Sequence, residues 1–349
     1  MAALAHPRPG DALAPLRREG GPHLAHRLVP RRAAGALGRP GVRRASGAGR
    51  PLQGLPHRPQ GRPAGRGLPP LTDLPAGSPC PPILPYGWRT LDRRWLLDDP
   101  RLHDRGAEPL REAHSPAQLY LTTGEGGVAG PWATVCAEIP DLHHFSGRGA
   151  RDVLPLWCDA GAQDPNATAP RGVRRDEVFF VVTALLGQPG FGARLGQQAG
   201  ELRLPLPRSP ALWAEGVLLG ARLVAACTEV EAMAPLPAGE PSRREGHLCL
   251  GGVPILALDD PAWAFRAGGL AVLPRLVAGR LGAGRWSSPL DALGVGWSPR
   301  DTDDLARALA RVRAILDLAP ALAGWLDRVL AADDLWGAAE WPAAADVVR

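Results

Sequence analysis

The pattern of apolar and polar positions changes at about residue 80. Residues 1–78 show no sustained apolar period of 3.6 or 2, because proline and glycine interrupt every short run. Such a segment cannot bury enough apolar surface to offset the cost of ordering its backbone, so we predict a disordered tail. From Pro81 onward, aromatic and β-branched residues return in clusters. We therefore place one folded domain at residues 79–335 and a second tail at residues 336–349.

Within this domain, residues 84–160 have a pattern that favours strands. Three short runs are rich in β-branched and aromatic residues and lie beside glycine or proline, which predicts strands at residues 118–123, 132–139 and 152–157.

Helical patterns dominate residues 172–232. Residues 176–186 are apolar on nearly all faces and are long enough for a buried helix. Ser209 is a good N-cap for a helix that begins at Pro210 and continues through Leu223.

A hairpin and closing helices complete the predicted fold. Residues 246–258 read as a β-hairpin that turns at Gly251-Gly252. In residues 287–332, Asp301 or Thr302 is expected to cap a helix that Pro320 breaks, with a second short helix after it. The order of strands, helices, hairpin and helices predicts an α+β fold rather than a regular βαβ alternation.

Composition and charge narrow the possible roles. All 40 basic residues other than histidine are arginine. Residues 1–80 have a net charge of +10, whereas residues 81–349 have a net charge of −5, so the basic character belongs to the tail. Such a tail can bind nucleic acid through phosphates, or it can simply be disordered and basic because of codon bias. Five scattered cysteines without a CxxC pair argue against a disulfide framework or a zinc site and favour the cytoplasm. No apolar run is long enough to predict a membrane span.

Motifs for catalysis are missing from the sequence. A phosphate-binding loop of the GxxxxGK[ST] type requires a lysine, and the GxSxG and HExxH motifs do not occur. His143 and His144 are adjacent, so on a strand they would point to opposite faces and would not easily share a metal ion. We therefore expect no catalytic centre, metal or cofactor in this chain.

Five clusters, in the expected order, resemble the C-terminal specificity domain of type ISP restriction–modification enzymes. The first (WRTLDRRW…DPRLHDR) is similar to a signature that follows the adenine-methyltransferase core of that family. The clusters are residues 88–105, 118–123 (QLYLTT), 141–157 (DLHHFSG…LPLW), 202–223 and 287–330. Gly124 departs from the pattern, because the family prefers arginine after the two threonines. The methyltransferase cofactor loop, the NPPY-type motif and the helicase and nuclease parts are missing from the sequence.

The resemblance implies that the chain recognises a sequence in double-stranded DNA, as the specificity module of an adenine-specific methyltransferase system. It also implies a separate methyltransferase or translocase polypeptide as a partner, with S-adenosylmethionine as the cofactor of the parent enzyme. The alternatives are a fragment of the methyltransferase itself, or a remnant that only binds a partner protein.

Ten residues are candidates for DNA contact. Thr122, Thr123, His143, His144 and Arg148 lie at the ends of predicted strands and beside glycines, where donors and acceptors could reach base edges. For the threonines the alternative is β-propensity, and for the histidines it is one core and one surface residue. The arginines of residues 88–105 either contact phosphates or pair with neighbouring aspartates. They are Arg89, Arg93, Arg94, Arg101 and Arg105.

Overall fold

The computed structural model describes most of the chain from residue 73 to residue 337. The described residues are 55–56, 68, 73–75, 77–99, 101, 108–124, 128–169, 172–195, 204–229, 234–281, 296–337 and 340. Most of both predicted tails therefore lies outside the described residues, and their disorder stays a prediction.

An antiparallel sheet forms the centre of the fold. Its strands are β4 (Tyr120–Thr123), β5 (Ala133–Cys136) and β6 (Asp152–Pro155), which confirm the three strands predicted from the sequence. The central strand is β4, between β5 and β6, and the two-residue strand β1 (Leu55–Pro56) pairs with the outer edge of β6. Nearly every position of these three strands is buried, so the sheet belongs to the core rather than to one exposed face.

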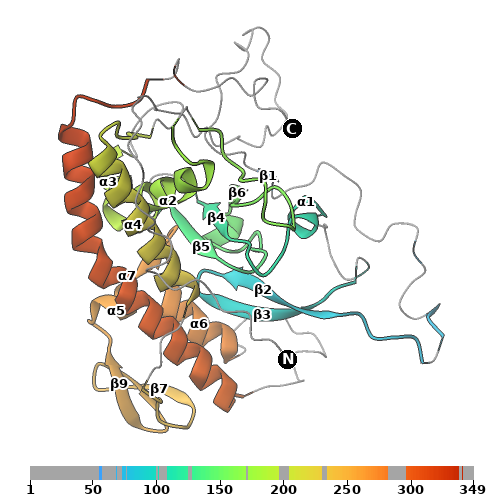
Figure 1. Ribbon diagram of the computed structural model, residues 1–349. Coiled ribbons are helices and arrows are strands. Elements are labelled where there is room, and N and C mark those ends of the chain that lie inside the picture. Colours follow the sequence, from blue (N-terminus) through green and yellow to red (C-terminus); the bar gives the residue numbers. More distant parts are fainter. Residues whose placement is uncertain are drawn as a thin grey trace, which may run out of the picture.

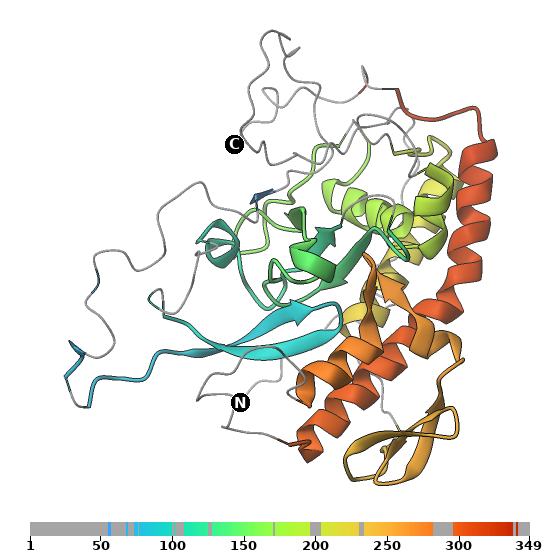
Figure 2. The same ribbon diagram turned by 180° about the vertical axis from the view of Figure 1, so that it is seen from behind.

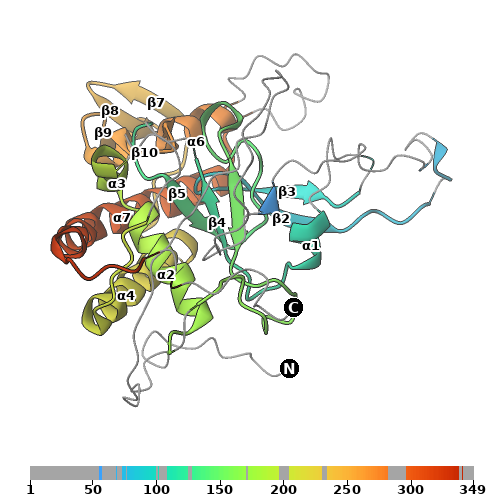
Figure 3. The ribbon, with the colours of Figure 1, turned by 90° about the horizontal axis from the view of Figure 1, so that it is seen from above.

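Three helices pack together and cover this sheet on one side (Figures 1 and 3). They are α2 (Arg175–Leu186), α4 (Pro210–Thr228) and α7 (Pro299–Ala331). The first two were predicted, and Ser209 caps α4 by accepting a hydrogen bond from the Leu212 amide. At Gly220 a Cβ atom would lie 1.9 Å from the Phe180 carbonyl oxygen, so α2 and α4 approach each other at a distance that only glycine allows.

Two predictions for the last helix were wrong. It begins after Ser298, which forms a capping box with Asp301, so neither Asp301 nor Thr302 is the cap. It also continues through Pro320. Proline removes one backbone hydrogen bond, but apolar side chains on both sides of it, including Leu318, Leu322 and Trp325, are buried in the same core. Burying each large apolar side chain stabilises the fold by about 2 kcal/mol, which offsets the loss of one backbone hydrogen bond.

The β-hairpin predicted at residues 246–258 is confirmed and gains a third strand. Strands β8 (His247–Leu250) and β9 (Val253–Ala257) turn at Gly251-Gly252, where both φ angles are positive as a two-residue turn requires. Strand β7 (Pro241–Arg244) pairs with the other edge of β8. The short elements α5 (Pro261–Ala264), β10 (Arg266–Ala267) and β11 (Leu270–Ala271) lead into α6 (Val272–Arg280).

A two-stranded hairpin extends from the body of the molecule (Figures 1 and 2). Its strands are β2 (Ile83–Arg89) and β3 (Asp92–Leu97), and the turn between them places Leu91 at a φ of 60°. The remaining short helices are α1 (Glu108–Glu112), η2 (Ser146–Arg148) and α3 (Pro189–Leu195). With small antiparallel sheets beside packed helices, the α+β fold is confirmed.

Helix α4 is long and apolar enough to cross a membrane by length and composition alone. Its side chains Trp213, Leu219 and Leu223 are buried among other parts of the chain, and its contacts are with α2, α7 and β5. This arrangement is that of a core helix in a folded domain.

Candidate functional site

The predicted threonine and histidine candidates divide between the interior and the surface. Thr122 is fully buried in the middle of the sheet, opposite Thr134 of β5. Thr134 Oγ1 lies 2.9 Å from Nε2 of His144, whose side chain is 1% exposed. Thr90 donates a hydrogen bond to the His144 carbonyl oxygen. The side chains of Thr122 and His144 are therefore enclosed by protein and belong to the interior of the fold.

His143 lies on the other side of the same segment. Its side chain is about one-third exposed, and its ring lies 5.1 Å from the ring of Trp88 at 33°. Asp141 Oδ1 lies 2.6 Å from His143 Nδ1, and Asp141 also accepts a hydrogen bond from Tyr86. The carboxylate therefore restricts the orientation of the imidazole, which packs against the indole.

Backbone hydrogen bonds hold this segment against β2. Gly87 donates to Ile139 and accepts from Asp141, and the Thr90 amide donates to His144. Residues of β2 and of the 139–144 segment thus form one surface, although the sequence separates them by about 50 residues.

Three of the predicted arginines are paired with acidic groups. Arg93 forms an ion pair with Glu138, and Arg94 forms one with Asp92. Arg101 donates hydrogen bonds to the Asp99 carboxylate from its backbone amide and from its guanidinium. The sequence left phosphate contact and salt bridging equally open for these arginines, and the observed ion pairs favour salt bridging. Arg93 and Arg300 also lie over the Trp95 ring, at 5.4 and 5.0 Å from its centroid.

Arg89 differs from these three. Its guanidinium lies 5.6 Å from the Trp88 ring centroid, and its Nε is buried without a hydrogen-bond partner in the described part of the chain. Burial, followed by the neighbouring charge of Arg275, lowers the pKa of Arg89. Of the other candidates, Thr123 is half-buried and bonds to the backbone of Asp152. Arg105 and the side chain of Arg148 lie outside the described residues.

A buried ionic cluster attaches the hairpin to the helices. Arg280, at the end of α6, contacts Asp92 of β3 at 2.7 Å, Asp301 at 2.9 Å and Asp304 at 3.0 Å. Its side chain is only 8% exposed. Three carboxylates around one guanidinium therefore fix β3 relative to α6 and α7, and with it the surface formed by Trp88, Arg89 and His143.

Sequence reasoning missed several residues of this surface. Tyr86, Trp88 and Asp141 position His143, and Arg280 of α6 contacts Asp92 of the hairpin. Trp88 lies in the cluster that resembles the family signature, so the sequence could have identified it as an aromatic residue beside arginines. No local signal links Arg280 to Asp92, because only the folded chain brings α6 to the hairpin.

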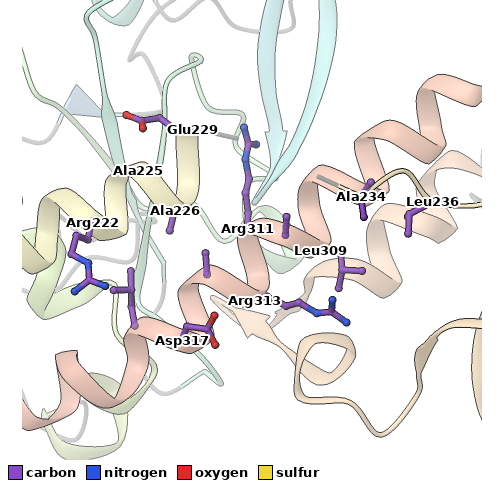
Figure 4. Close-up of a pocket in the computed structure, with 14 residues that line it drawn as sticks. Arg222, Ala225, Ala226, Glu229, Ala234, Leu236, Leu309, Arg311, Arg313 and Asp317 are labelled. Atoms are coloured by element: carbon purple, nitrogen blue, oxygen red, sulfur yellow. The ribbon is translucent and has the colours of Figure 1, made fainter. Parts of the chain in front are cut away.

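Away from this surface, a hollow of about 650 Å³ lies between α4 and α7 (Figure 4). Alanines form much of its wall. Its charged lining residues are Arg222, Glu229, Arg311, Arg313 and Asp317. Arg311 donates a hydrogen bond to the Thr228 carbonyl oxygen, and burial lowers its pKa. Among the lining residues that the structure describes, no serine, threonine, cysteine or histidine occurs.

The structure is an α+β domain that has arginine and tryptophan side chains on the β2–β3 hairpin and His143 packed against Trp88. Residues 67–248, more than half of the chain, match the family described as the Type ISP C-terminal specificity domain. The chain belongs to this family of specificity domains, which confirms the resemblance found in the sequence. No curated protein matches the chain.

Solved structures show the same fold. One is a nuclease-deletion mutant of the Type ISP restriction–modification enzyme LlaGI in complex with a DNA substrate mimic, with 13% identity over 69% of this chain and a TM-score of 0.51. The DrdV–DNA complex has 17% identity over 68% of this chain and a TM-score of 0.51. The ATP-dependent Type ISP enzyme LlaBIII bound to DNA has 12% identity over 69% and a TM-score of 0.50. The matched region is 18–28% of the length of these enzymes.

The described residues do not fit S-adenosylmethionine, the cofactor that the parent enzymes imply. Nucleotide cofactors of this kind are held where a parallel strand passes through a glycine-rich loop into a helix. Every strand ladder in the described part of the chain is antiparallel, so it does not provide this unit.

Proposed function

We propose that this chain recognises a sequence in double-stranded DNA as the specificity module of a Type ISP restriction–modification system. The observation that carries the proposal is the match of residues 67–248 to the Type ISP specificity domain. The similarity in fold to three enzymes solved with DNA supports it.

The β2–β3 surface has side chains suited to this role. The imidazole of His143 is about one-third exposed and could contact a base edge, while Asp141 and Trp88 restrict its orientation. Thr123 and Arg148 remain candidates for DNA contact. The net charge of residues 81–349 is −5, so attraction to DNA must come from local arginines and not from the whole domain.

Catalysis would come from a separate polypeptide. The solved relatives are several times longer than the region matched here, and the described residues do not fit S-adenosylmethionine. We therefore assign cofactor binding and methyl transfer to a methyltransferase or translocase partner, in the cytoplasm where DNA is available. The recognition module would hold the duplex so that the partner acts on an adenine within the recognised site.

The direct test is a titration of labelled duplex DNA with the full-length chain at several salt concentrations. Phosphate contacts predict that the logarithm of the affinity falls linearly with the logarithm of the salt concentration. Fluorescence anisotropy would measure this dependence, and single-stranded DNA of the same sequence is the control. If no duplex is bound even at low salt by a chain that is folded, the proposal is wrong.

The assignment of cofactor binding has its own test. Isothermal titration calorimetry of the purified chain with S-adenosylmethionine is expected to show no heat of binding. Saturable binding of the cofactor would instead identify the chain as part of the methyltransferase itself.

A further inference from the structure

Trp95 is half-exposed on the β2–β3 hairpin, with two arginines over its ring. The guanidinium carbon of Arg93, on the same strand, lies 5.4 Å from the ring centroid. That of Arg300, in the first turn of α7, lies 5.0 Å from the same centroid. A guanidinium over an indole is attracted to the π electrons of the ring. These three side chains therefore form one group, the Trp95 cluster, although Arg300 is far from the hairpin in sequence.

The buried ionic cluster explains how α7 reaches the hairpin. Arg280 contacts Asp92 of β3 at 2.7 Å and Asp301 of α7 at 2.9 Å. Asp301 follows Arg300 directly, and Asp92 lies three residues before Trp95 on the same strand. The ion pairs thus hold the start of α7 against β3, and they bring Arg300 to the Trp95 ring.

The charge of Arg300 has no ion-paired carboxylate in the described part of the chain. Asp301 and Asp304, which follow it on α7, contact the guanidinium at the end of α6 at 2.9 and 3.0 Å. Asp303 lies 3.9 Å from Arg307. The N-terminal end of a helix already carries partial positive charge, so a guanidinium at this position does not stabilise α7. An anion here would be attracted both by Arg300 and by the helix end.

An apolar strip continues from Trp95 along the same face of the hairpin. Trp95 pairs with Pro85, and Ile83 pairs with Leu97 two residues further along. Ile83 is 59% exposed and Leu97 is 40% exposed. A DNA strand fits both features, because its phosphates are anionic and its deoxyriboses offer C–H groups. A second copy of the chain fits less well, because a two-fold interface would place the same arginines opposite each other.

We propose that the Trp95 cluster is a second contact to the backbone of the recognised duplex. Arg300 binds a phosphate, and the Trp95 indole packs against the adjoining deoxyribose. Arg93, which Glu138 holds at 3.1 Å, keeps the ring in place. Contacts of this kind fix the position of the protein on the duplex and carry no sequence information. The identity of the ligand as DNA rests on the proposed function.

The Trp95 cluster is close to the surface already assigned to base contact. Arg93 pairs with Gly87, the residue before Trp88, and Trp95 lies two residues further along β3, about 7 Å away. One turn of duplex DNA is about 34 Å long. A duplex that contacts Trp88 and His143 would therefore extend past the Trp95 cluster, and both surfaces can contact one DNA molecule.

The first experiment measures duplex binding by Arg300→Gln and Trp95→Ala in the full-length chain, by fluorescence anisotropy. Arg300→Gln is expected to weaken binding roughly tenfold, as loss of a charge-assisted hydrogen bond does. Its salt slope should fall by about 0.9, because one phosphate contact is lost. Trp95→Ala should weaken binding roughly fivefold, because Arg300 loses the ring that orients it. Each loss should be equal for all duplex sequences.

Arg328→Gln is the matched control, since Arg328 is an exposed arginine on α7 that is paired with Glu215. It should leave both the affinity and the salt slope unchanged. Circular dichroism checks that each variant is folded. If the parent binds DNA and the Arg300 and Trp95 variants bind equally well, the backbone contact is wrong while the proposed function stands. If the folded parent binds no DNA, both proposals fail.

A second experiment tests proximity without relying on affinity. Benzoylphenylalanine replaces Ile83 beside Trp95, or Val253 on β9 as a control of similar exposure, and each protein is irradiated with labelled duplex. Crosslinking from position 83 alone is expected, and its absence would overturn the proposal. Sedimentation velocity of the parent without DNA tests the other occupant. A dimer that Trp95→Ala dissociates would assign the surface to a second copy and overturn the DNA contact.

Discussion

The β4–β5–β6 sheet and the β2–β3 hairpin both contain residues predicted to contact DNA, but their polar side chains differ in burial and in pairing. In the sheet and the segment beside it, Thr134 and His144 face each other and are enclosed by protein. On the hairpin, Trp95 is half-exposed and Arg89 has no acidic partner in the described part of the chain. Thr134 and His144 of the first region are therefore enclosed in the fold, whereas Arg89 of the second keeps a charge that no described carboxylate pairs with.

The same contrast separates the arginines predicted to contact DNA. Arg93, Arg94 and Arg101 each have a carboxylate, so DNA would have to compete with an existing partner. Arg89 has no ion-paired competitor among the described residues. Residue type and position in a motif therefore do not identify a contact residue. What matters is whether the folded protein already satisfies its charge and hydrogen bonds.

The largest effect on stability is expected from Arg280→Met, which tests whether the hairpin depends on the helices. Removal of this guanidinium leaves Asp92, Asp301 and Asp304 as neighbouring buried carboxylates. Breaking a buried ionic cluster in this way costs about 3–5 kcal/mol. Urea denaturation measures the change in free energy of unfolding. Arg328→Met, which removes an exposed ion pair, should cost less than about 1 kcal/mol, and equal losses in the two variants would contradict the account.

A smaller loss is expected from His144→Ala, which tests the interior half of the comparison. The variant removes the contact with Thr134 and opens a cavity behind the sheet, at a cost of about 2–3 kcal/mol in the free energy of unfolding. The affinity of the folded fraction for DNA should not change. A titration of a labelled duplex, corrected for the fraction of protein that is folded, would measure it. A selective loss of DNA binding at unchanged stability would place His144 in the interface after all.

His143→Ala should give the opposite pattern to His144→Ala. His143 is partly exposed and does not fill the core, so the free energy of unfolding should change by less than about 0.5 kcal/mol. Affinity for the preferred sequence should fall roughly fivefold, by about 1 kcal/mol, and affinity for unrelated duplexes should fall less. Competition binding measures the difference, and an equal fall for all sequences would rule out a base contact.

The smallest effect concerns pH and His114, which contacts the Tyr120 hydroxyl at 3.0 Å. Burial lowers the pKa of His114 below its ordinary value of 6.5, although the charge of Glu138 opposes the shift. The unfolded chain therefore binds a proton at His114 more readily than the folded chain does. The free energy of unfolding is unaffected by His114 above about pH 6.5, and it decreases as the pH falls from there toward the pKa of His114 in the folded protein. His114→Gln should make the urea midpoint less dependent on pH between 7.5 and 5.5. An unchanged dependence would exclude His114 as its source.

Local signals in the sequence were sufficient for much of the fold. The β-branched runs gave β4, β5 and β6, Ser209-Pro210 gave the start of α4, and Gly251-Gly252 gave the turn of the β8–β9 hairpin. Each of these depends on neighbours in sequence. The continuation of α7 through Pro320 depends on burial of both halves in one core, which the local rule for proline does not include.

The candidate site was less predictable for the same reason. Adjacent histidines suggested that one points inward and one outward, but only the contacts of His144 with Thr90 and Thr134 show which is inside. The pairing of Arg94 with Asp92 is local and was considered from the sequence. The ion pair of Arg280 with Asp92 joins positions far apart in the chain and has no sequence pattern of its own.

The most direct test of the central claim is selection of duplexes from a random pool by the full-length chain, followed by sequencing. A specificity module is expected to enrich one shared sequence that contains an adenine. The Arg300→Gln variant should enrich the same sequence, but only at lower salt, because it loses a phosphate contact and no base contact. Retention of the pool without a shared sequence, or no retention at low salt by a folded chain, would contradict sequence-specific recognition.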